Sequence, residues 1–136
     1  MSKSTPVSPS RPLLGALLVA ASAASLAPYL ASTVGLEVNT SDTLEAVTHA
    51  VPGALVLALA ALALVGNAGA VAPATTMVAA GMWMTGTHLP LLVDAAQGRV
   101  EWAAALWHSV PAIVVLGLAS LCLVGATRPP ETALKP

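Results

Sequence analysis

The stretch that decides the fold is residues 46–93, AVTHAVPGALVLALAALALVGNAGAVAPATTMVAAGMWMTGTHLPLLV. It contains no formally charged side chain over 48 residues, although about 20 apolar residues are enough for one helix to cross a bilayer. The stretch must therefore be broken. Gly66-Asn67-Ala68-Gly69 followed by Pro73 supplies the break, because Gly and Asn favour a helix end and Pro favours a helix start. We expect two membrane helices here.

Two further uncharged stretches flank this pair, residues 13–36 and 103–125, and Arg128-Pro129-Pro130 ends the second of them. Each is long enough to span a bilayer. We therefore expect an all-α membrane domain over 13–127, in which four transmembrane helices form a four-helix bundle. The expected spans are about 13–35, 46–66, 72–93 and 103–125. The tails 1–12 and 128–136 are rich in Ser, Pro and Thr, and we expect them to be disordered.

The composition excludes two classes of protein. Only 8% of the residues are charged and 57% are hydrophobic, whereas roughly 25% of a soluble domain is charged, so the expected surroundings are a lipid bilayer. Five basic residues and a net charge of −1 leave no basic patch for phosphates, so nucleic acid is not an expected partner. The single cysteine, Cys122, excludes an internal disulfide. Abundant Ala, Leu and Val without any Phe is typical of a high-GC bacterial genome.

The basic residues predict the orientation. Lys3 and Arg11 precede the first span, Arg128 and Lys135 follow the last, and only Arg99 lies in a connection on the other side. The positive-inside rule then places both termini of this multi-pass protein in the cytoplasm, with the helices in the inner (plasma) membrane.

An alternative for the N-terminus is a signal peptide over residues 1–23 that ends at the small residues Ala21-Ser22-Ala23. The apolar stretch continues for about another dozen residues beyond that point, which favours a membrane helix instead.

The chain looks internally duplicated. Displaced by 59 residues, His49-Ala50-Val51-Pro52 falls on His108-Ser109-Val110-Pro111, and more than half of the positions in 49–66 match those in 108–125. The repeats would cover about 13–67 and 72–127. Each is a helical hairpin that starts in the cytoplasm, so the two tandem hairpins are related by a pseudo-two-fold axis along the membrane normal.

The three histidines are the main chemical feature. At 1.5 Å per residue, His49, His88 and His108 all lie within roughly 5–8 Å of the outer membrane boundary. An ionisable side chain at membrane depth suggests a functional site. The repeat makes His49 and His108 a symmetric pair, which is what bis-histidine ligation of haem b requires. His88 would then be an alternative ligand, or would hydrogen-bond a ligand or a propionate.

Small side chains continue below both repeated histidines. They allow close helix packing or leave room for a flat cofactor, and these two uses compete. The expected packing residues are Gly53, Val56, Ala60 and Ala63 on one helix, and Ala112, Val115, Ala119 and Cys122 on the other.

Two other interpretations of the histidines stay open. Met77, Gly81, Met84 and His88 share one helix face, and thioether with imidazole suits Cu(I) at His88 and Met84, with Cys122 a remote further ligand. Alternatively, the histidine in each His-x-x-Pro only helps to satisfy a backbone carbonyl that the proline frees, so that the pattern is a device for starting a helix.

The acidic residues near the histidines have an ordinary explanation. Asp42-Thr43-Leu44-Glu45 has the spacing of a helix-capping box. Glu45 and Glu101 are nevertheless the acids nearest to His49 and His108 along the chain.

No Ser-His-acid arrangement, glycine-rich phosphate loop or Cys-x-x-Cys stands out, so we expect no enzyme. The predicted function is a non-enzymatic accessory or scaffold subunit that packs against a membrane partner or a second copy. A haem- or metal-binding electron-transfer protein is the alternative, and a small-solute transporter is the second alternative.

Overall fold

The computed structural model describes residues 10–38, 40–65 and 71–127, and every regular element in these ranges is helical. The expected all-α class is therefore confirmed. The long helices are α1 (Arg11–Val34), α3 (Val51–Val65), α4 (Val71–Ala96) and α5 (Trp102–Thr127). The short helix α2 (Asp42–Glu45) and the π-helical turn η1 (Ala46–Ala50) lead into α3 without a break. The expected break at 66–69, the tail 128–136 and most of the tail 1–12 lie outside the described residues.

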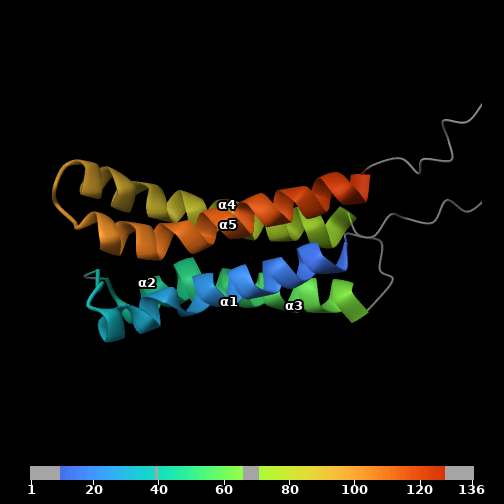
Figure 1. The fold of residues 1–136 in the computed structure, drawn as a ribbon, viewed down its shortest axis with the longest axis horizontal. Coiled ribbons are helices and arrows are strands. Elements are labelled where there is room, and N and C mark those ends of the chain that lie inside the picture. Colours follow the sequence, from blue (N-terminus) through green and yellow to red (C-terminus); the bar gives the residue numbers. More distant parts are fainter. Residues whose placement is uncertain (1–9, 39, 66–70, 128–136) are drawn as a thin grey trace, which may run out of the picture.

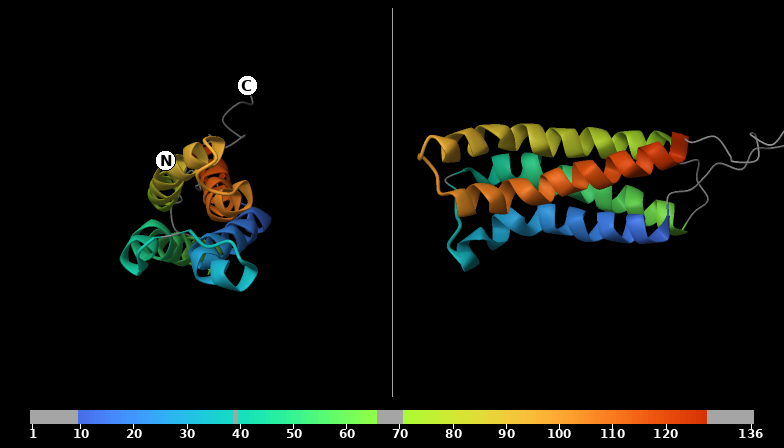
Figure 2. Two further views of the ribbon diagram at one scale, coloured as in Figure 1. Left: turned by 90° about the vertical axis from the view of Figure 1, so that its left-hand side faces the viewer. Right: turned by 45° about the horizontal axis from the view of Figure 1, so that its top comes forward.

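The long helices run side by side as a bundle (Figure 1). α1 packs against α3 and α5, and α4 packs against α5 and α3. The start of α1 and the end of α5 lie at one end of the bundle, and the α1–α2 and α4–α5 connections lie at the other (Figure 1). Seen from that second end, the rods enclose a common interior (Figure 2). We call the end that carries these two connections the loop end.

Three rods are long and apolar enough to cross a membrane, namely Arg11–Val34, Asp42–Val65 and Trp102–Thr127. They have 24, 24 and 26 residues, so the helical rise makes each longer than the roughly 30 Å of bilayer hydrocarbon. By composition the chain is a small membrane-embedded helical protein. α4 is as long as α5 but less apolar, since it carries four threonines and His88. The expectation of four spans is thus met for three of them.

The helix ends follow local sequence chemistry. α1 begins at Arg11, two residues before its expected start, with Pro12 in the first turn where its missing N–H costs nothing. It ends at Gly35, whose φ of 71° is left-handed. The N-cap of α2 is Ser41, whose Oγ accepts a hydrogen bond from the Leu44 N–H at 3.2 Å. Glu45 therefore does not complete the capping box expected from Asp42–Glu45, and its side chain is free for another contact.

Small residues bring the helices close together along the interior. A Cβ added at Gly53 of α3 would lie 1.8 Å from the Ser25 Oγ of α1, and one added at Gly81 of α4 would lie 2.9 Å from the Leu116 Cα of α5. Of the expected packing residues, Ala63 is partly buried against the core and the rest are buried: Gly53, Val56, Ala60, Ala112, Val115, Ala119 and Cys122.

The outer surface of the bundle is apolar. Large side chains such as Val19, Leu62 and Leu121 are more than half exposed, and they belong to α1, α3 and α5. Exposed apolar side chains on every face are what helices surrounded by lipid present. The buried polar side chains of the described residues lie instead toward the loop end, and they are Thr48, His49, His88, His108 and Ser109.

Candidate functional site

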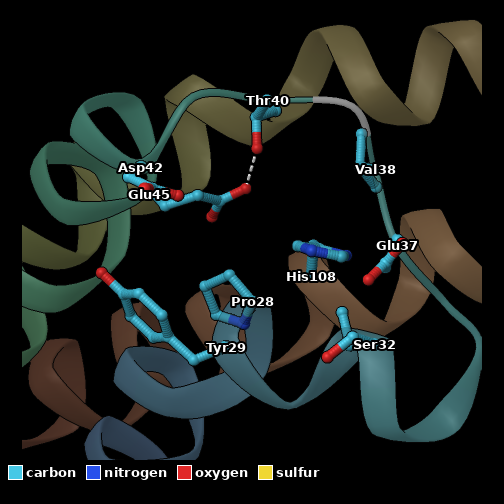
Figure 3. Close-up of a pocket in the computed structure, with 10 residues that line it drawn as sticks. Pro28, Tyr29, Ser32, Glu37, Val38, Thr40, Asp42, Glu45 and His108 are labelled. Carbon is cyan, nitrogen blue, oxygen red and sulfur yellow. Dashed lines mark hydrogen bonds between the residues drawn. The ribbon is translucent and has the colours of Figure 1, made fainter.

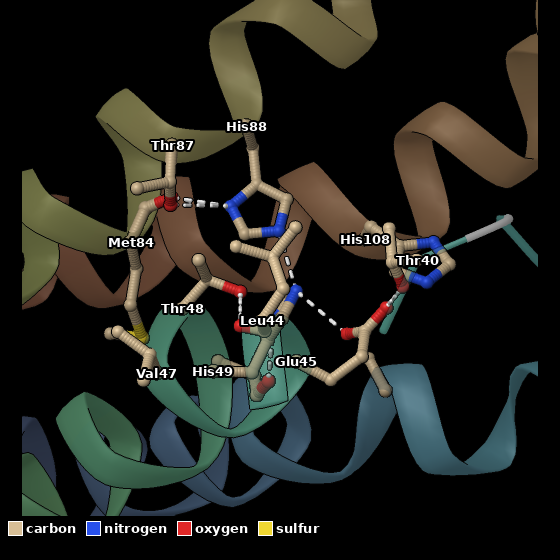
Figure 4. Close-up of polar contacts among 12 residues, drawn as sticks. Thr40, Leu44, Glu45, Val47, Thr48, His49, Met84, Thr87, His88 and His108 are labelled. Carbon is tan, nitrogen blue, oxygen red and sulfur yellow. Dashed lines mark hydrogen bonds and ion pairs between the residues drawn. The ribbon is translucent and has the colours of Figure 1, made fainter. Parts of the chain in front are cut away.

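Each of three helical elements carries one histidine near the loop end of the bundle. His49 comes from η1, His88 from α4 and His108 from α5, with relative exposures of 1%, 7% and 3%. The sequence predicted that the three share one layer. The structure places them together there, as Figure 4 shows.

His49 is the central ring of this group. Its Nε2 lies 2.5 Å from the Nε2 of His88, and the ring centroids of these two are 4.2 Å apart. The centroid of His108 lies 5.9 Å from that of His49, with the planes at 68°. The direct contact is therefore between His49 and His88, whereas the sequence-predicted symmetric pair, His49 and His108, stands farther apart.

A proline on another helix fixes the orientation of His49. Pro28 lies inside α1 and has no N–H, so the carbonyl of Ala24, four residues earlier, lacks its helical donor. The Nδ1–H of His49 donates to this carbonyl at 2.9 Å. Since Nδ1 carries the proton of the neutral ring, Nε2 presents a lone pair to His88.

The π-helical turn that carries His49 is held by a second proline-linked contact. In a π-helix the donor to the Val47 carbonyl would be residue 52, which is proline and has no N–H. The indole Nε1 of Trp83 on α4 donates to this carbonyl at 3.1 Å. This bond ties α4 to η1 one turn away from His88.

His88 faces hydrogen-bond acceptors at both ring nitrogens. Its Nδ1 contacts the Met84 carbonyl, and its Nε2 faces the His49 lone pair. The Thr87 hydroxyl is 3.3 Å from Nδ1, but its own proton goes to the carbonyl of Trp83 or Met84. With the Nδ1 proton of each ring on a backbone carbonyl, the contact between the two Nε2 atoms is a hydrogen bond only when one of the two rings carries a second proton, so that the pair holds one imidazolium.

Glu45 supplies the nearest negative charge. Its Oε2 lies 3.7 Å from the Nε2 of His49, and its Oε1 accepts a hydrogen bond from the Thr40 hydroxyl. Oε2 is buried and accepts no hydrogen bond from the described residues. Figure 4 shows the carboxylate between Thr40 and His49. The carboxylate can therefore balance a positive charge shared by the histidine pair.

His108 is anchored separately. Its Nδ1–H donates to the Ala104 carbonyl one turn earlier on α5, at 2.9 Å. Its Nε2 therefore carries a lone pair, and it makes no hydrogen bond within the described part of the chain. The Trp107 indole, next to His108 on α5, donates to the Ala27 carbonyl of α1 at 2.7 Å, which holds the two helices together beside the site.

Two of the cavities at the loop end reach both His108 and Glu45. One, of about 630 Å³, lies between α1 and the segment that leads to α2, and we call it the acidic cavity. Figure 3 shows Pro28 and Tyr29 of α1 on one side of it, and Glu45, His108 and Glu37 around it. The other, of about 400 Å³, reaches His49 and His88, and we call it the pair cavity. Polar solutes at the loop end can thus approach the histidines.

The remaining candidate ligands are not gathered at this site. Met84 meets His88 through its carbonyl oxygen, while Met77 is buried in the core farther down α4. Cys122 is buried 14 residues from His108 on α5, about 21 Å along the helix. Among the described residues, no three His, Cys, Asp or Glu side chains stand close enough around one point to hold a metal ion.

Sequence reasoning explained Glu45 by a helix cap, named it with Glu101 as an acid near the histidines, and did not single out Ala24 or Thr40. The residue type of Ala24 does not show that its carbonyl takes part in a site. Pro28, four residues later, does show that this carbonyl lacks its helical donor. Ser41 directly before Asp42 was the signal that the cap could form without Glu45.

Comparison with known proteins gives no relative: no protein-family model, no curated protein and no solved structure matches this chain.

Proposed function

We propose that this chain is a four-span integral membrane protein that binds one proton at the His49–His88 pair, close to one face of the membrane. The observation that carries the proposal is that His88 has an acceptor at each ring nitrogen, the Met84 carbonyl and the His49 Nε2. Histidine is also the side chain whose charge ordinarily changes between about pH 5 and 8.

Removing the proton leaves an unfavourable contact. If both rings are neutral with their Nδ1 protons on the carbonyls of Ala24 and Met84, two Nε2 lone pairs face each other at 2.5 Å. One proton between them turns this repulsion into a charge-assisted hydrogen bond. Glu45 then pairs with the resulting cation, so that the buried centre carries no net charge.

The proposed fourth span is α4. Its 26 residues extend for about 39 Å, and it packs along α5, which is long and apolar enough to span. Its polar His88 is buried while Met82, Trp83 and Leu89 are more than half exposed, so that its lipid-facing side is apolar. The two hairpins, α1 with the α2–α3 rod and α4 with α5, are the proposed tandem repeats.

The proposed orientation puts the termini in the cytoplasm and the loop end outside the plasma membrane. It rests on Lys3, Arg11, Arg128 and Lys135 at the terminal side against Arg99 at the loop end. In this orientation the histidine centre exchanges its proton with the outer face. Arg99 itself is paired with Asp94.

The proposed role remains that of a non-enzymatic accessory subunit. A buried centre that binds a proton without a reacting substrate suits a subunit that responds to pH outside the membrane. The apolar outer faces of the bundle are where a membrane partner or a second copy would pack.

Nitrogen-15 NMR of histidine-labelled protein in lipid nanodiscs tests the proposal. The expected result is that His88 shows both nitrogens protonated at the acid end of a pH titration and loses one proton as the pH rises. The replacement His108→Gln, outside the pair, is the control that keeps this behaviour. A pair in which both His49 and His88 stay neutral from about pH 4 to 8 would contradict the proposal.

The same preparation tests the haem and copper alternatives. A Soret band that disappears in both His49→Ala and His108→Ala would assign haem b to those residues. Bound copper lost in His88→Ala and Met84→Leu would assign a copper site. Either result would show that haem or copper, and not a proton, is the ligand of this centre.

A further inference from the structure

We propose that the acidic cavity is a binding site for small primary ammonium ions, that is, for protonated aliphatic amines. The cavity lies between α1 and the segment that leads to α2 (Figure 3). It is distinct from the pair cavity, in which the His49–His88 contact lies, and the two share His108 and Glu45. The proposal does not require that the pair bind a proton, but the two centres share Glu45, whose carboxylate borders both cavities.

The groups around the acidic cavity are mostly acceptors. Glu37, Asp42 and Glu45 contribute three carboxylates, and no Lys or Arg is among the described residues that line it. This arrangement favours a cation and disfavours an anion.

His108 is the independent observation that points to a ligand. It is 3% exposed and lines this cavity. Its Nδ1–H is already donated to Ala104, so its Nε2 can only accept, and that nitrogen has no partner among the described residues. The buried Oε2 of Glu45 also lacks a hydrogen bond there. Two acceptors, the Nε2 of His108 and the buried Oε2 of Glu45, thus lack a protein donor among the described residues, and a ligand that brings N–H groups would satisfy both.

The size and walls of the cavity favour an organic cation over an inorganic one. Its volume of about 630 Å³ falls in the range of sites for small organic molecules. Na⁺ and Ca²⁺ prefer a close cage of oxygen atoms, and a neutral imidazole nitrogen is a poor ligand for them. Pro28 and Tyr29 provide an apolar wall and an aromatic ring beside the carboxylates, which suits an alkyl chain next to a charged head.

The ligand must donate hydrogen bonds as well as carry charge. A primary ammonium has three N–H donors, which matches the Nε2 of His108 and the carboxylates. A quaternary ammonium has the charge but no N–H, and an alcohol of the same length has the chain but no charge. These three probes separate the contributions of charge, donors and apolar surface.

Calorimetric titration of the full-length protein in nanodiscs with n-butylammonium, tetramethylammonium, n-butanol and Ca²⁺ tests the proposal. Saturable binding of one n-butylammonium per chain, with no measurable binding of the other three, is the expected result. Equal binding of tetramethylammonium would overturn the donor requirement, and equal binding of n-butanol would overturn the charge requirement. Binding of Ca²⁺ in preference to the amine would make this an inorganic cation site.

Variants of exposed residues keep the test independent of folding. Glu37→Gln and Asp42→Asn each remove one exposed carboxylate of the cavity, and we expect each to weaken n-butylammonium binding by about threefold to fivefold. Asp94→Asn is the matched control, because Asp94 lines only the pair cavity and is paired with Arg99. Unchanged affinity in both cavity variants, or an equal loss in Asp94→Asn, would place the amine elsewhere. The NMR signals of His88 report on the proton centre in the same samples.

Discussion

The imidazole Nδ1 of His49 lies 2.9 Å from the carbonyl oxygen of Ala24, the acceptor that Pro28 leaves without a helical donor. The sequence suggested that His49 and Pro52, three residues apart on one helix, formed a local device for starting that helix. In the structure His49 instead donates to the Ala24 carbonyl of a different helix, which Pro28 of that helix leaves without its backbone donor. The contact thus links α1 to η1 and fixes which nitrogen of His49 faces His88.

The indole of Trp107 makes a comparable interhelical bond to the Ala27 carbonyl, 2.7 Å away. We expect Trp107→Phe to destabilise the protein by about 0.5–1.5 kcal/mol, because the replacement removes one interhelical hydrogen bond while the Ala27 carbonyl keeps its helical donor. Trp102→Phe is the control, since Trp102 is more than half exposed and no bond from its indole is seen within the described chain. Equal thermal shifts for the two variants in detergent would show that the Trp107 bond contributes nothing specific.

Close helix packing at Gly53 predicts that a larger side chain at this position destabilises the protein. Gly53→Ala would bring a Cβ to 1.8 Å from the Ser25 hydroxyl, and such overpacking costs about 1–3 kcal/mol. Gly117→Ala is the matched control, because a Cβ there meets nothing within 4 Å. It should be neutral or slightly stabilising.

The double variant Gly53→Ala with Ser25→Ala separates the clash from helix propensity. It should recover most of the stability lost in Gly53→Ala, because the Ser25 Oγ that the new methyl group meets is gone. A double variant no more stable than Gly53→Ala would show that the backbone of α1, and not the Ser25 hydroxyl, sets the limit.

Farther along the same helix, Ala60 is completely buried and its neighbour Ala61 is exposed. Ala60→Leu should lower the free energy of unfolding by about 1–3 kcal/mol, because the core has no room for the larger side chain. Ala61→Leu should have little effect, since its side chain faces the apolar surroundings. Thermal unfolding in one detergent measures both, and a tolerated Ala60→Leu would mean that the helices can separate at this level.

The four long helices could be predicted from the sequence because each uncharged apolar stretch is about as long as one bilayer-spanning helix, and the residues between the stretches favour helix ends. Their ends differ from the predicted spans by a few residues, most at Asp42, where Ser41 caps the rod earlier than the apolar pattern begins. The common depth of His49, His88 and His108 could also be predicted, since the helical rise alone determines it.

The pairing within the histidine layer could not be predicted, because depth does not fix the direction in which a side chain points around its helix. The repeat suggested His49 opposite His108, whereas the π-helical turn and the Ala24 carbonyl turn His49 toward His88. The role of Glu45 could not be predicted for a related reason. The N-cap is Ser41 and not Asp42, and this shift of one residue leaves the Glu45 carboxylate free to contact His49.

The orientation of the bundle predicts which side of the membrane the loop end faces. A cysteine introduced at Gln97, in the exposed turn between α4 and α5, should react with a membrane-impermeant maleimide in intact cells. The native Cys122 is completely buried, so its background reaction should be low. Labelling of the Gln97→Cys variant only after permeabilisation would place the loop end, and the histidine centre with it, in the cytoplasm.

The last prediction concerns the charge that balances the proton. Glu45→Gln keeps an oxygen that can accept from Thr40 but removes the negative charge 3.7 Å from the Nε2 of His49. Without that charge the protonated pair is a buried cation with no counter-ion, so we expect the centre to release its proton at a lower pH than in the unmodified protein. The pH of half-release, followed by the His88 nitrogen signals in nanodiscs, measures the effect.

Glu101→Gln is the matched control for this change. Glu101 is an exposed acid at the loop end that lines neither the acidic cavity nor the pair cavity, and screening by water and salt weakens its effect on the histidines. Its removal should leave the pH of half-release nearly unchanged. If Glu45→Gln and Glu101→Gln shift the release equally, the effect comes from the general charge of the loop end, and Glu45 is not the specific counter-charge of the pair.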